Sequence, residues 1–384
     1  RRWKDEVVGK LTGGVAQMAK GRKVQVVEGT GRFTSPHHLE VDGQSISFDN
    51  AIIAAGSRAA TLPDLPYDDE RLMDSTDALE LADVPKRLLV IGCGIIGLEL
   101  ATVYDALGSE VTMVELADQL IPGADPDIVK PLRKRIEGRY AGVHLETKVE
   151  KLEAHKRGLK ATFSEGGPDA RYFDRVLVAV GRTPNGADLG LEEAGVEVVD
   201  GGFIGVDERQ RTNVKHIYAI GDVVPGPALA HKATYEAKVA AEVIAGQDVV
   251  YDARGIPAVA YTDPEVAWVG LTETQAKADG TEYEAASFPW SASGRALGID
   301  AADGMTKVLV DPESKQVLGY GIVGANAGEL IAEATLALET GADADDVGLT
   351  IHAHPTLSET VRFAAEIAAG TITDLPQKRQ RSRG

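Results

Sequence analysis

The chain has one cysteine, fewer basic than acidic residues, and no long apolar run. Cys93 is the single cysteine among 384 residues, which excludes an internal disulfide and fits a reducing compartment. No run of eighteen apolar residues occurs, so a membrane-spanning helix is not expected. The net charge of −19 disfavours a nucleic-acid partner, because a phosphate backbone would be repelled. No signal-peptide pattern is recognised, and we expect a cytoplasmic protein.

A glycine-rich turn between a strand and a helix is the strongest motif. Residues 88–91 form an apolar run that includes the β-branched Val90 and Ile91, as is typical of a buried parallel strand. The G-x-G-x-x-G spacing of Gly92, Gly94 and Gly97 follows, and then an apolar-faced helix. In this pattern the first glycine permits a tight turn, the second lets a pyrophosphate approach the backbone, and the third lets the helix pack on the strand. We therefore expect a dinucleotide diphosphate at the helix N-terminus.

An acidic residue completes this motif. The next strand, residues 110–114, ends at Glu115, about twenty positions beyond the glycines, where a carboxylate binds the ribose hydroxyls of a dinucleotide. A carboxylate there repels a 2′-phosphate, so Glu115 favours NAD over NADP. The alternative is a glycine-rich packing turn with an incidental glutamate. Cys93, between the glycines, is interpreted as a small packed residue and not as a redox centre.

A second candidate site is the stretch Tyr218-Ala-Ile-Gly-Asp222. The carboxylate of Asp222 follows a buried strand and a glycine, where it can accept hydrogen bonds from a polyol. The alternative is that Asp222 caps a helix or a turn. Residues 228–232 open a helix nearby in the sequence, so a cofactor could lie against that helix.

The third candidate site is the stretch Ile351-His-Ala-His-Pro-Thr-Leu-Ser-Glu359. His354 precedes Pro355, which biases its backbone away from helix, and Pro355 suits a first helical turn. Glu359 would lie one turn inside that helix and reach back to the imidazole. A glutamate that orients a histidine makes a general acid–base pair. The alternatives are a capping histidine with a surface glutamate, or His352 in place of His354.

The elements expected elsewhere divide the chain into three parts. The first part combines residues 1–57 and 203–245 as the back half of a nucleotide-binding domain, followed by a central domain to about residue 187 and a third, α+β domain from about residue 251. In the first part we expect a helix at 1–20, strands at 23–28 and 50–57, a loop at 33–37 and a hairpin that turns at Asp42-Gly43.

These motifs together resemble those of the pyridine nucleotide-disulfide oxidoreductases. Four further stretches are similar to that family, and in particular to its members that oxidise dihydrolipoyl groups with NAD⁺: residues 52–57, 181–185, 256–270 and 352–357. The resemblance implies an α/β fold with two Rossmann-like domains and a C-terminal α+β interface domain. The implied bounds are 1–74 with 188–250 for the FAD domain, 75–187 for the NAD domain, 251–375 for the interface domain and 376–384 for a basic tail.

The resemblance also implies functional residues. FAD would contact Gly31, Asp222 and Ala230. NAD would contact Glu99, Glu115, Val149 and Gly181 together with the glycine turn, which consists of Gly92, Cys93, Gly94, Ile95, Ile96 and Gly97. His354 would be the acid–base and Glu359 its orienting partner, both serving the active site of the other subunit of a homodimer. The implied partners are lipoyl domains and the E2 core of 2-oxo acid dehydrogenase complexes, and no metal is implied.

The chain also departs from the family pattern. The family has an N-terminal G-x-G-x-x-G for FAD and a C-x-x-x-x-C redox disulfide, and neither is present in these residues. We therefore expect an N-terminally truncated chain that is colourless and inactive alone and that exposes Ile52 and Ile53. The alternative functions are another disulfide reductase, of the glutathione or mercuric reductase type, and a redox-inactive dimer that binds NAD.

Overall fold

The computed structural model describes residues 1–375, and the basic tail expected at 376–384 lies outside the described residues. The chain forms two compact units. The first contains residues 1–60, 80–82 and 181–252, and the second contains the rest of the described chain. Among residues 1–375, no helix combines the length and the apolar character needed to cross a membrane.

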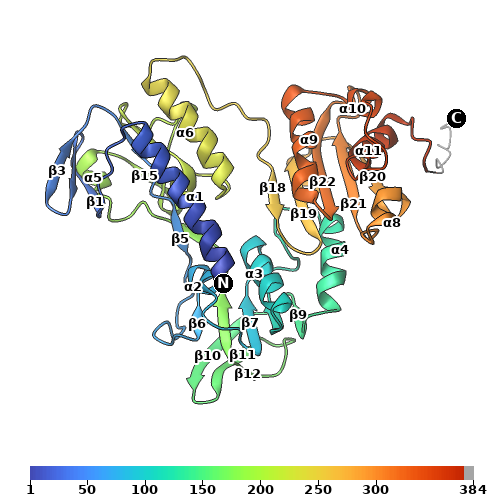
Figure 1. Ribbon diagram of the computed structural model, residues 1–384, viewed down its shortest axis with the longest axis horizontal. Coiled ribbons are helices and arrows are strands. Elements are labelled where there is room, and N and C mark those ends of the chain that lie inside the picture. Colours follow the sequence, from blue (N-terminus) through green and yellow to red (C-terminus); the bar gives the residue numbers. More distant parts are fainter. Residues whose placement is uncertain (376–384) are drawn as a thin grey trace. The chain divides into compact units, whose positions relative to one another are not determined.

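The first unit consists of small sheets and two longer helices (Figure 1). Its elements are α1 (Arg2–Gly21), β1 (Gly31–Ser35), β2 (His38–Val41), β3 (Gln44–Ser47), β4 (Ala51–Ile53), β5 (Ser57–Ala59), β14 (Arg182–Pro184), α5 (Leu191–Ala194), β15 (Val198–Val199), η1 (Asp200–Gly202), β16 (Phe203–Ile204), β17 (Ile217–Ala219), η2 (Gly221–Val223) and α6 (Ala230–Ile244). Strands β1, β2 and β3 form an antiparallel meander, and β4 pairs in parallel with β17.

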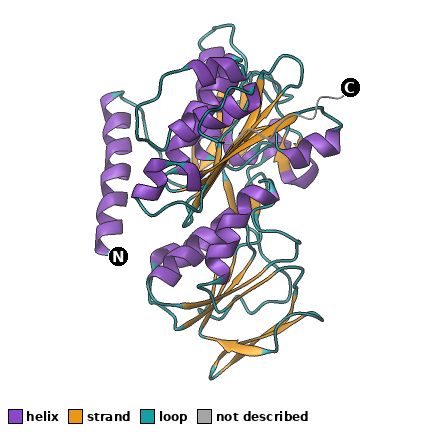
Figure 2. Ribbon diagram, turned by 90° about the vertical axis from the view of Figure 1, so that its right-hand side faces the viewer, coloured by secondary structure: helices purple, strands orange, loops and turns teal. Residues whose placement is uncertain are grey.

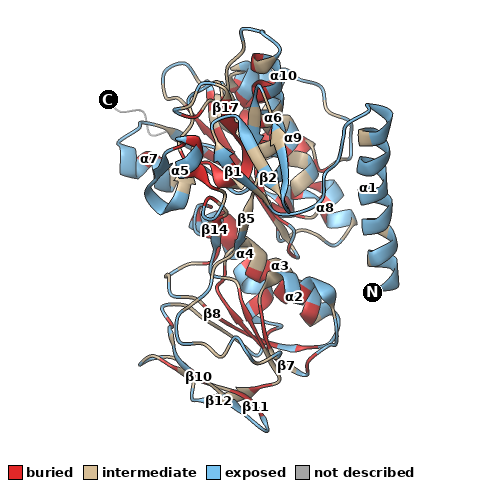
Figure 3. Ribbon diagram, turned by 90° about the vertical axis from the view of Figure 1, so that its left-hand side faces the viewer, coloured by how far each residue is buried: buried red, intermediate tan, exposed pale blue. Residues whose placement is uncertain are grey.

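Two expectations for this unit are confirmed. The hairpin between β2 and β3 turns at Asp42 and Gly43, both of which have positive φ, as a tight hairpin requires. The expected N-terminal helix is present as α1, but none of its residues is buried, and Figure 3 shows it pale blue over most of its length. A third expectation is confirmed only for Ile52, which is exposed. The expected exposure of Ile53 is wrong: β4 turns alternate side chains to opposite faces, and Ile53 is buried against Phe33 and Ala219.

Two other expectations for this unit are wrong. Residues 23–28 form no strand, and Val24 and Val26 are exposed. Within the described residues no neighbouring strand takes up their backbone N–H and C=O groups, and an isolated β-branched run does not form a strand by itself. The loop expected at 33–37 is partly strand β1, because Phe33 pairs with Leu39 across the meander.

The second unit begins with a parallel sheet of five strands in the order β6-β13-β7-β8-β9. Its elements are β6 (Leu72–Met73), α2 (Ser75–Glu80), β7 (Arg87–Ile91), α3 (Ile95–Ala106), β8 (Glu110–Val114), α4 (Pro126–Glu137), β9 (Gly142–His144), β10 (Val149–His155), β11 (Gly158–Phe163), β12 (Arg171–Phe173) and β13 (Arg175–Val178). The central strand β7 is buried on both faces, which explains its unbroken apolar sequence (Figure 3).

The second unit continues with an antiparallel sheet of five strands in the order β18-β19-β22-β21-β20. Its elements are β18 (Ala258–Ala260), β19 (Glu265–Gly270), α7 (Glu273–Asp279), β20 (Glu284–Pro289), η3 (Trp290–Ala292), α8 (Gly294–Gly298), β21 (Met305–Val310), β22 (Val317–Gly324), α9 (Ala327–Thr340), α10 (Ala344–Leu349) and α11 (Glu359–Ala369). Helices α9 and α11 cover one face of this sheet (Figure 2).

Helix α4 packs against strands β19 and β22 of the same sheet. At Gly321 in β22 an added Cβ would lie 2.8 Å from Ile128 of α4, so glycine lets the helix approach the strand closely. On β21, Val308 packs in the core shared with α9 and α11, whereas its neighbour Lys307 reaches toward α4, as strand alternation requires.

One helix boundary differs from the expectation. We expected a helix from Pro355 with Glu359 one turn inside it, but α11 begins at Glu359. Residues 351–358 form an irregular segment, and the pairing of Glu359 with His354 is made from the first helical residue. The carboxylate of Glu359 accepts the N–H of Thr356, which fixes the approach to the helix.

Candidate active site and nucleotide sites

The glycine turn has the geometry that its spacing predicts. Gly92 has φ +103°, and an added Cβ there would lie 2.3 Å from the carbonyl oxygen of Ala179. A Cβ on Gly97 would lie 2.1 Å from the carbonyl oxygen of Gly92, so a side chain there would separate α3 from β7. At Gly94, by contrast, no atom lies within 4 Å of the Cβ position. The turn is therefore closed where helix and strand meet and open at the start of α3, where a diphosphate would bind.

The Gly97→Ala variant is expected to lose dinucleotide binding and to unfold more easily. A methyl group 2.1 Å from a backbone oxygen forces α3 away from β7, and overpacking of this kind costs typically ~1–3 kcal/mol. Urea unfolding and NADH titration of the purified chain measure both effects. Gly13→Ala, in the exposed helix α1, is the control for space, because no atom lies within 4 Å of its Cβ position and its φ is not positive. An unchanged affinity for NADH in Gly97→Ala would contradict the assigned close contact.

Glu115 holds the glycine turn directly. Its Oε2 accepts the backbone N–H of Cys93 at 2.7 Å, and its Oε1 accepts the N–H of Ala117 at 2.9 Å. The carboxylate is therefore fixed at the end of β8, beside the turn. Cys93 is fully buried, and burial, reinforced by the charge of Glu115, raises the pKa of its thiol. The interpretation of Cys93 as a packed residue agrees with this environment.

The other residues assigned to NAD lie in three places. Glu99, on α3, accepts the N–H of Tyr261 at 2.9 Å; burial raises its pKa, and this hydrogen bond opposes the shift. Val149 begins β10 and packs against the apolar cluster of the parallel sheet. Ile95 and Ile96 open α3. Gly181 belongs to the first compact unit, where its carbonyl accepts the N–H of Ala60.

The residues assigned to FAD lie in the first unit. Asp222, in η2, accepts the hydroxyl of Ser57 at 2.5 Å, and the guanidinium of Arg182 lies 3.7 Å from the same carboxylate oxygen. Ala230 is the first residue of α6, which packs against η2. Gly31 begins β1, and no described contact joins it to Asp222.

Sequence reasoning missed two residues that hold the turn before Asp222. Lys232 and Glu236 form an ion pair of 2.8 Å on α6, with both side chains 4% exposed. The carboxylate of Glu236 accepts the N–H of Gly221 at 2.7 Å, and the ammonium of Lys232 donates to the carbonyl oxygen of Gly221 at 3.2 Å. A lysine and a glutamate four residues apart are adjacent on a helix face, but only the fold shows that this face is buried.

The histidine–glutamate pair is formed as expected. Nδ1 of His354 lies 3.0 Å from Oε1 of Glu359. The imidazole is 77% exposed, whereas the carboxylate is 9% exposed. Because an ionised carboxylate can only accept, Nδ1 carries the proton and Nε2 is the basic nitrogen that faces outward.

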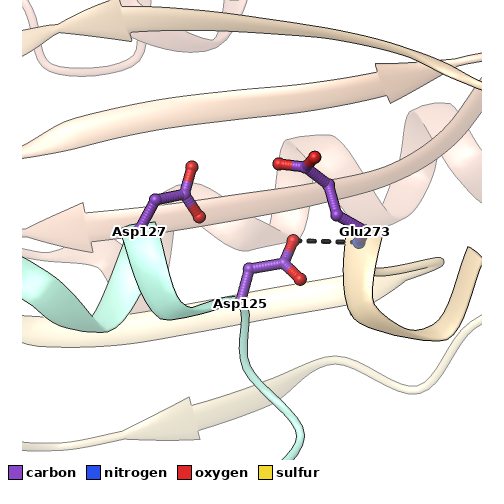
Figure 4. Close-up of side chains that lie close together, drawn as sticks. All are labelled: Asp125, Asp127 and Glu273. Atoms are coloured by element: carbon purple, nitrogen blue, oxygen red, sulfur yellow. Dashed lines mark hydrogen bonds between the residues drawn. The ribbon is translucent and has the colours of Figure 1, made fainter. Parts of the chain in front are cut away.

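Elsewhere in the second unit, a cluster of three carboxylates surrounds a lysine. Asp125, Asp127 and Glu273 converge in Figure 4, where the dashed line is the bond from the N–H of Glu273 to Asp125. Their spacing would suit a metal ion, but the ammonium of Lys307 lies 2.6 to 2.8 Å from an oxygen of each of them. The lysine, with its side chain 1% exposed, thus supplies the positive charge at this point.

The glycine turn with Glu115 fits a dinucleotide, and the loop around Asp222 fits part of a flavin nucleotide. The open Cβ position of Gly94, the start of α3 and the fixed carboxylate of Glu115 provide a place for a dinucleotide diphosphate and its ribose. For a flavin, Asp222 at the end of a buried strand provides an acceptor for a polyol, and the Lys232–Glu236 pair fixes its loop.

Comparison with known proteins defines the class. The family model of the pyridine nucleotide-disulphide oxidoreductases matches residues 2–237, and that of their dimerisation domain matches residues 256–365. The chain belongs to this family, whose members use FAD and NAD(H), and the dimerisation domain supports a homodimer.

Similar proteins narrow the class. The dihydrolipoyl dehydrogenase of Vibrio cholerae serotype O1 is 55% identical over 100% of this chain and 82% of its own length. That of Bacillus subtilis is 44% identical over 96% of this chain and 80% of its own length. Among solved structures, the HOCl-induced flavoprotein disulfide reductase RclA from Escherichia coli has a TM-score of 0.88 at 27% identity, covering 95% of this chain and 85% of that one.

Proposed function

We propose that this chain serves the flavin-dependent oxidation of dihydrolipoyl groups to lipoyl groups with reduction of NAD⁺ to NADH. Relatives at 44–55% identity are named dihydrolipoyl dehydrogenases. The observation in the structure that carries the proposal is the exposed imidazole of His354 with Glu359 behind it. Such a pair suits proton transfer from a thiol, and the glycine turn with Glu115 suits NAD.

Proton handling follows from the hydrogen bond between the two residues. Glu359 fixes the tautomer of His354 that has a proton on Nδ1, so Nε2 accepts a proton from a dihydrolipoyl thiol. The buried carboxylate then stabilises the imidazolium that forms. Bound FAD supplies the two-electron transfer between the dithiol and NAD⁺. In this proposal His354 and Glu359 act in the site of the other subunit.

The nucleotide assignments are part of the proposal. FAD would be held by Gly31, Asp222 and Ala230, and NAD by the glycine turn of residues 92–97 with Glu99, Glu115, Val149 and Gly181. Asp222 and Glu115 are the carboxylates placed for hydroxyl groups, as their positions after buried strands support. We also propose lipoyl domains and the E2 core of 2-oxo acid dehydrogenase complexes as partners, in the cytoplasm.

A substrate assay tests the function. Because the 384 residues hold one cysteine, the assay uses the chain extended ahead of Arg1 by a family-type segment with C-x-x-x-x-C. We expect NAD⁺ reduction with dihydrolipoamide, and no oxidation of NADH or NADPH with glutathione disulfide or Hg²⁺ as the electron acceptor. Turnover of glutathione disulfide instead would favour the other disulfide reductases. Flavin loading and NADH binding without dithiol turnover would favour a redox-inactive dimer.

The cofactor preference gives a separate prediction. The purified chain is expected to bind NADH at least about tenfold more tightly than NADPH, since a 2′-phosphate beside the fixed carboxylate of Glu115 costs more than ~1.4 kcal/mol. Glu115→Gln should narrow the gap and Glu110→Gln, at the exposed start of β8, should not. Fluorescence titration measures both affinities, and equal binding of the two dinucleotides by the unmodified chain would refute the assignment.

A further inference from the structure

The structure contains two histidine–glutamate pairs whose histidines are two residues apart but whose imidazoles differ in exposure. The imidazole of His354 is 77% exposed, whereas that of His352 is 5% exposed. Each pairs with a carboxylate on a different helix, Glu359 at the start of α11 and Glu333 within α9. His352 is therefore shielded from a substrate thiol, and it can act only through the groups that its ring contacts.

Both ring nitrogens of His352 face acceptors. Nδ1 lies 2.8 Å from the carbonyl oxygen of Thr350, which can only accept, so this nitrogen carries a proton. Nε2 lies 2.5 Å from Oε1 of Glu333. That contact requires one more proton, held either by the imidazole or by the carboxyl group. The ring thus joins the backbone of the irregular segment to helix α9 through two hydrogen bonds.

The segment that His352 holds is the one that carries His354. Residues 350–358 lie between α10 and α11 without regular structure. Inside the segment, the hydroxyl of Thr356 donates to the carbonyl of Ala353 at 2.7 Å. Beyond it, Glu359 accepts from Thr356. Ile351 is 93% exposed, so its side chain makes no apolar anchor within this chain.

We propose that His352 and Glu333 form a positioning pair that fixes the backbone of residues 350–354 and so places the imidazole of His354 for proton transfer. This inference rests on the proposed function, in which His354 is the acid–base. Without the pair, the segment is still held to α10 at Thr350, through its own turn, and on its α11 side by Glu359 and the buried Leu357, while its link to α9 is released. His354 would then sample several orientations, although its bond to Glu359 could still form.

Two further titratable side chains lie near the pair. Tyr320, on β22, has a buried hydroxyl, and burial, together with the charge of Glu333, raises its pKa. Glu366, on α11, interacts electrostatically with His352; burial is the main cause of its raised pKa, with Arg362 and His352 opposing the shift and Asp374 adding to it. The carboxylate of Glu333 thus lies near a buried phenol, and that of Glu366 lies within electrostatic reach of His352.

Two measurements on the 384-residue chain test the positioning directly. In ¹⁵N-histidine NMR the ring nitrogens of His352 should show a protonated Nδ1 and a hydrogen-bonded Nε2. In His352→Gln and Glu333→Gln, backbone amide exchange in residues 350–358 should become faster and the ring signals of His354 should shift. His155→Gln, an exposed histidine on β10, is the control and should change neither. Unchanged exchange and unchanged His354 signals in both variants would overturn the proposal.

An activity assay separates positioning from general destabilisation. In the flavin-loaded chain extended by the C-x-x-x-x-C segment, His352→Gln and Glu333→Gln should each lower kcat for dithiol oxidation by roughly tenfold to a hundredfold, the usual consequence of a misplaced catalytic group. KM for NAD⁺ and the thermal unfolding midpoint should stay near those of the parent, and the double variant should lose little more than either single variant. The proposal would be overturned if the kcat losses of the two single variants added in the double variant, or if the kcat losses paralleled losses in the unfolding midpoint. If the parent lacks dithiol turnover, the proposed function fails, while the exchange and NMR results still decide the positioning.

Discussion

His354→Gln is expected to slow dithiol oxidation by about 10²–10⁴-fold in the flavin-loaded chain extended by the C-x-x-x-x-C segment, the range typical of a lost general base. Glutamine cannot take a thiol proton, although it can still donate to Glu359. The side chain is largely exposed, so we expect stability to change little. Stopped-flow reduction by dihydrolipoamide isolates this half-reaction from hydride transfer to NAD⁺.

Two comparisons sharpen this prediction. Glu359→Gln should retain part of the rate, because the imidazole remains while its tautomer and imidazolium lose their anionic partner. His352→Gln should cost less than His354→Gln, because both nitrogens of His352 are engaged within the protein. A larger loss in His352→Gln than in His354→Gln would show that the wrong histidine has been assigned.

Lys307→Met is expected to lower the free energy of unfolding by about 3–5 kcal/mol, the usual cost when one partner of a buried charge cluster is removed. Its ammonium, 1% exposed, is the cation shared by Asp125, Asp127 and Glu273. Without it three carboxylates face one another between α4 and the antiparallel sheet. Urea unfolding followed by tryptophan fluorescence measures the effect. Lys315→Met removes a half-exposed surface pair with Glu284 and should cost no more than about 1 kcal/mol.

The same cluster predicts a pH dependence with a definite sign. Burial opposes ionisation of Asp125 most strongly, but Lys307 and the N–H groups of Glu273 and Thr274 outweigh it and lower the pKa of Asp125. The pKa of Glu273 is lowered in the same way, against its burial. A depressed carboxyl pKa contributes stability above its unfolded value, about pH 4, and that contribution is lost as the pH falls through the folded value.

Removing the lysine should reverse that dependence. In Lys307→Met the carboxylates lose their cation, so protonation relieves their repulsion, and the gap to the parent should narrow as the pH falls from 7 toward 4. Unfolding midpoints of both proteins across this range measure the gap. A loss below about 1 kcal/mol at pH 7, or a gap independent of pH, would contradict the assigned role of Lys307.

The sequence by itself determined the parts of this protein that are encoded over short distances. The G-x-G-x-x-G turn with Glu115 and the pairing of His354 with Glu359 could be predicted, because strand, turn and helix signals follow one another along the chain. The hairpin at Asp42-Gly43 could be predicted for the same reason: two adjacent residues set the turn.

Only the tertiary structure decided which distant side chains meet. Lys307 lies 180 residues from Asp127, and His352 lies 19 residues from Glu333, with no periodicity to announce either contact. The tertiary structure also decided where β-branched sequence fails to form a strand, as at residues 23–28, since a strand needs a neighbour to take up its backbone hydrogen bonds. Local propensity selects the type of element. The burial and the partners of its side chains depend on the whole fold.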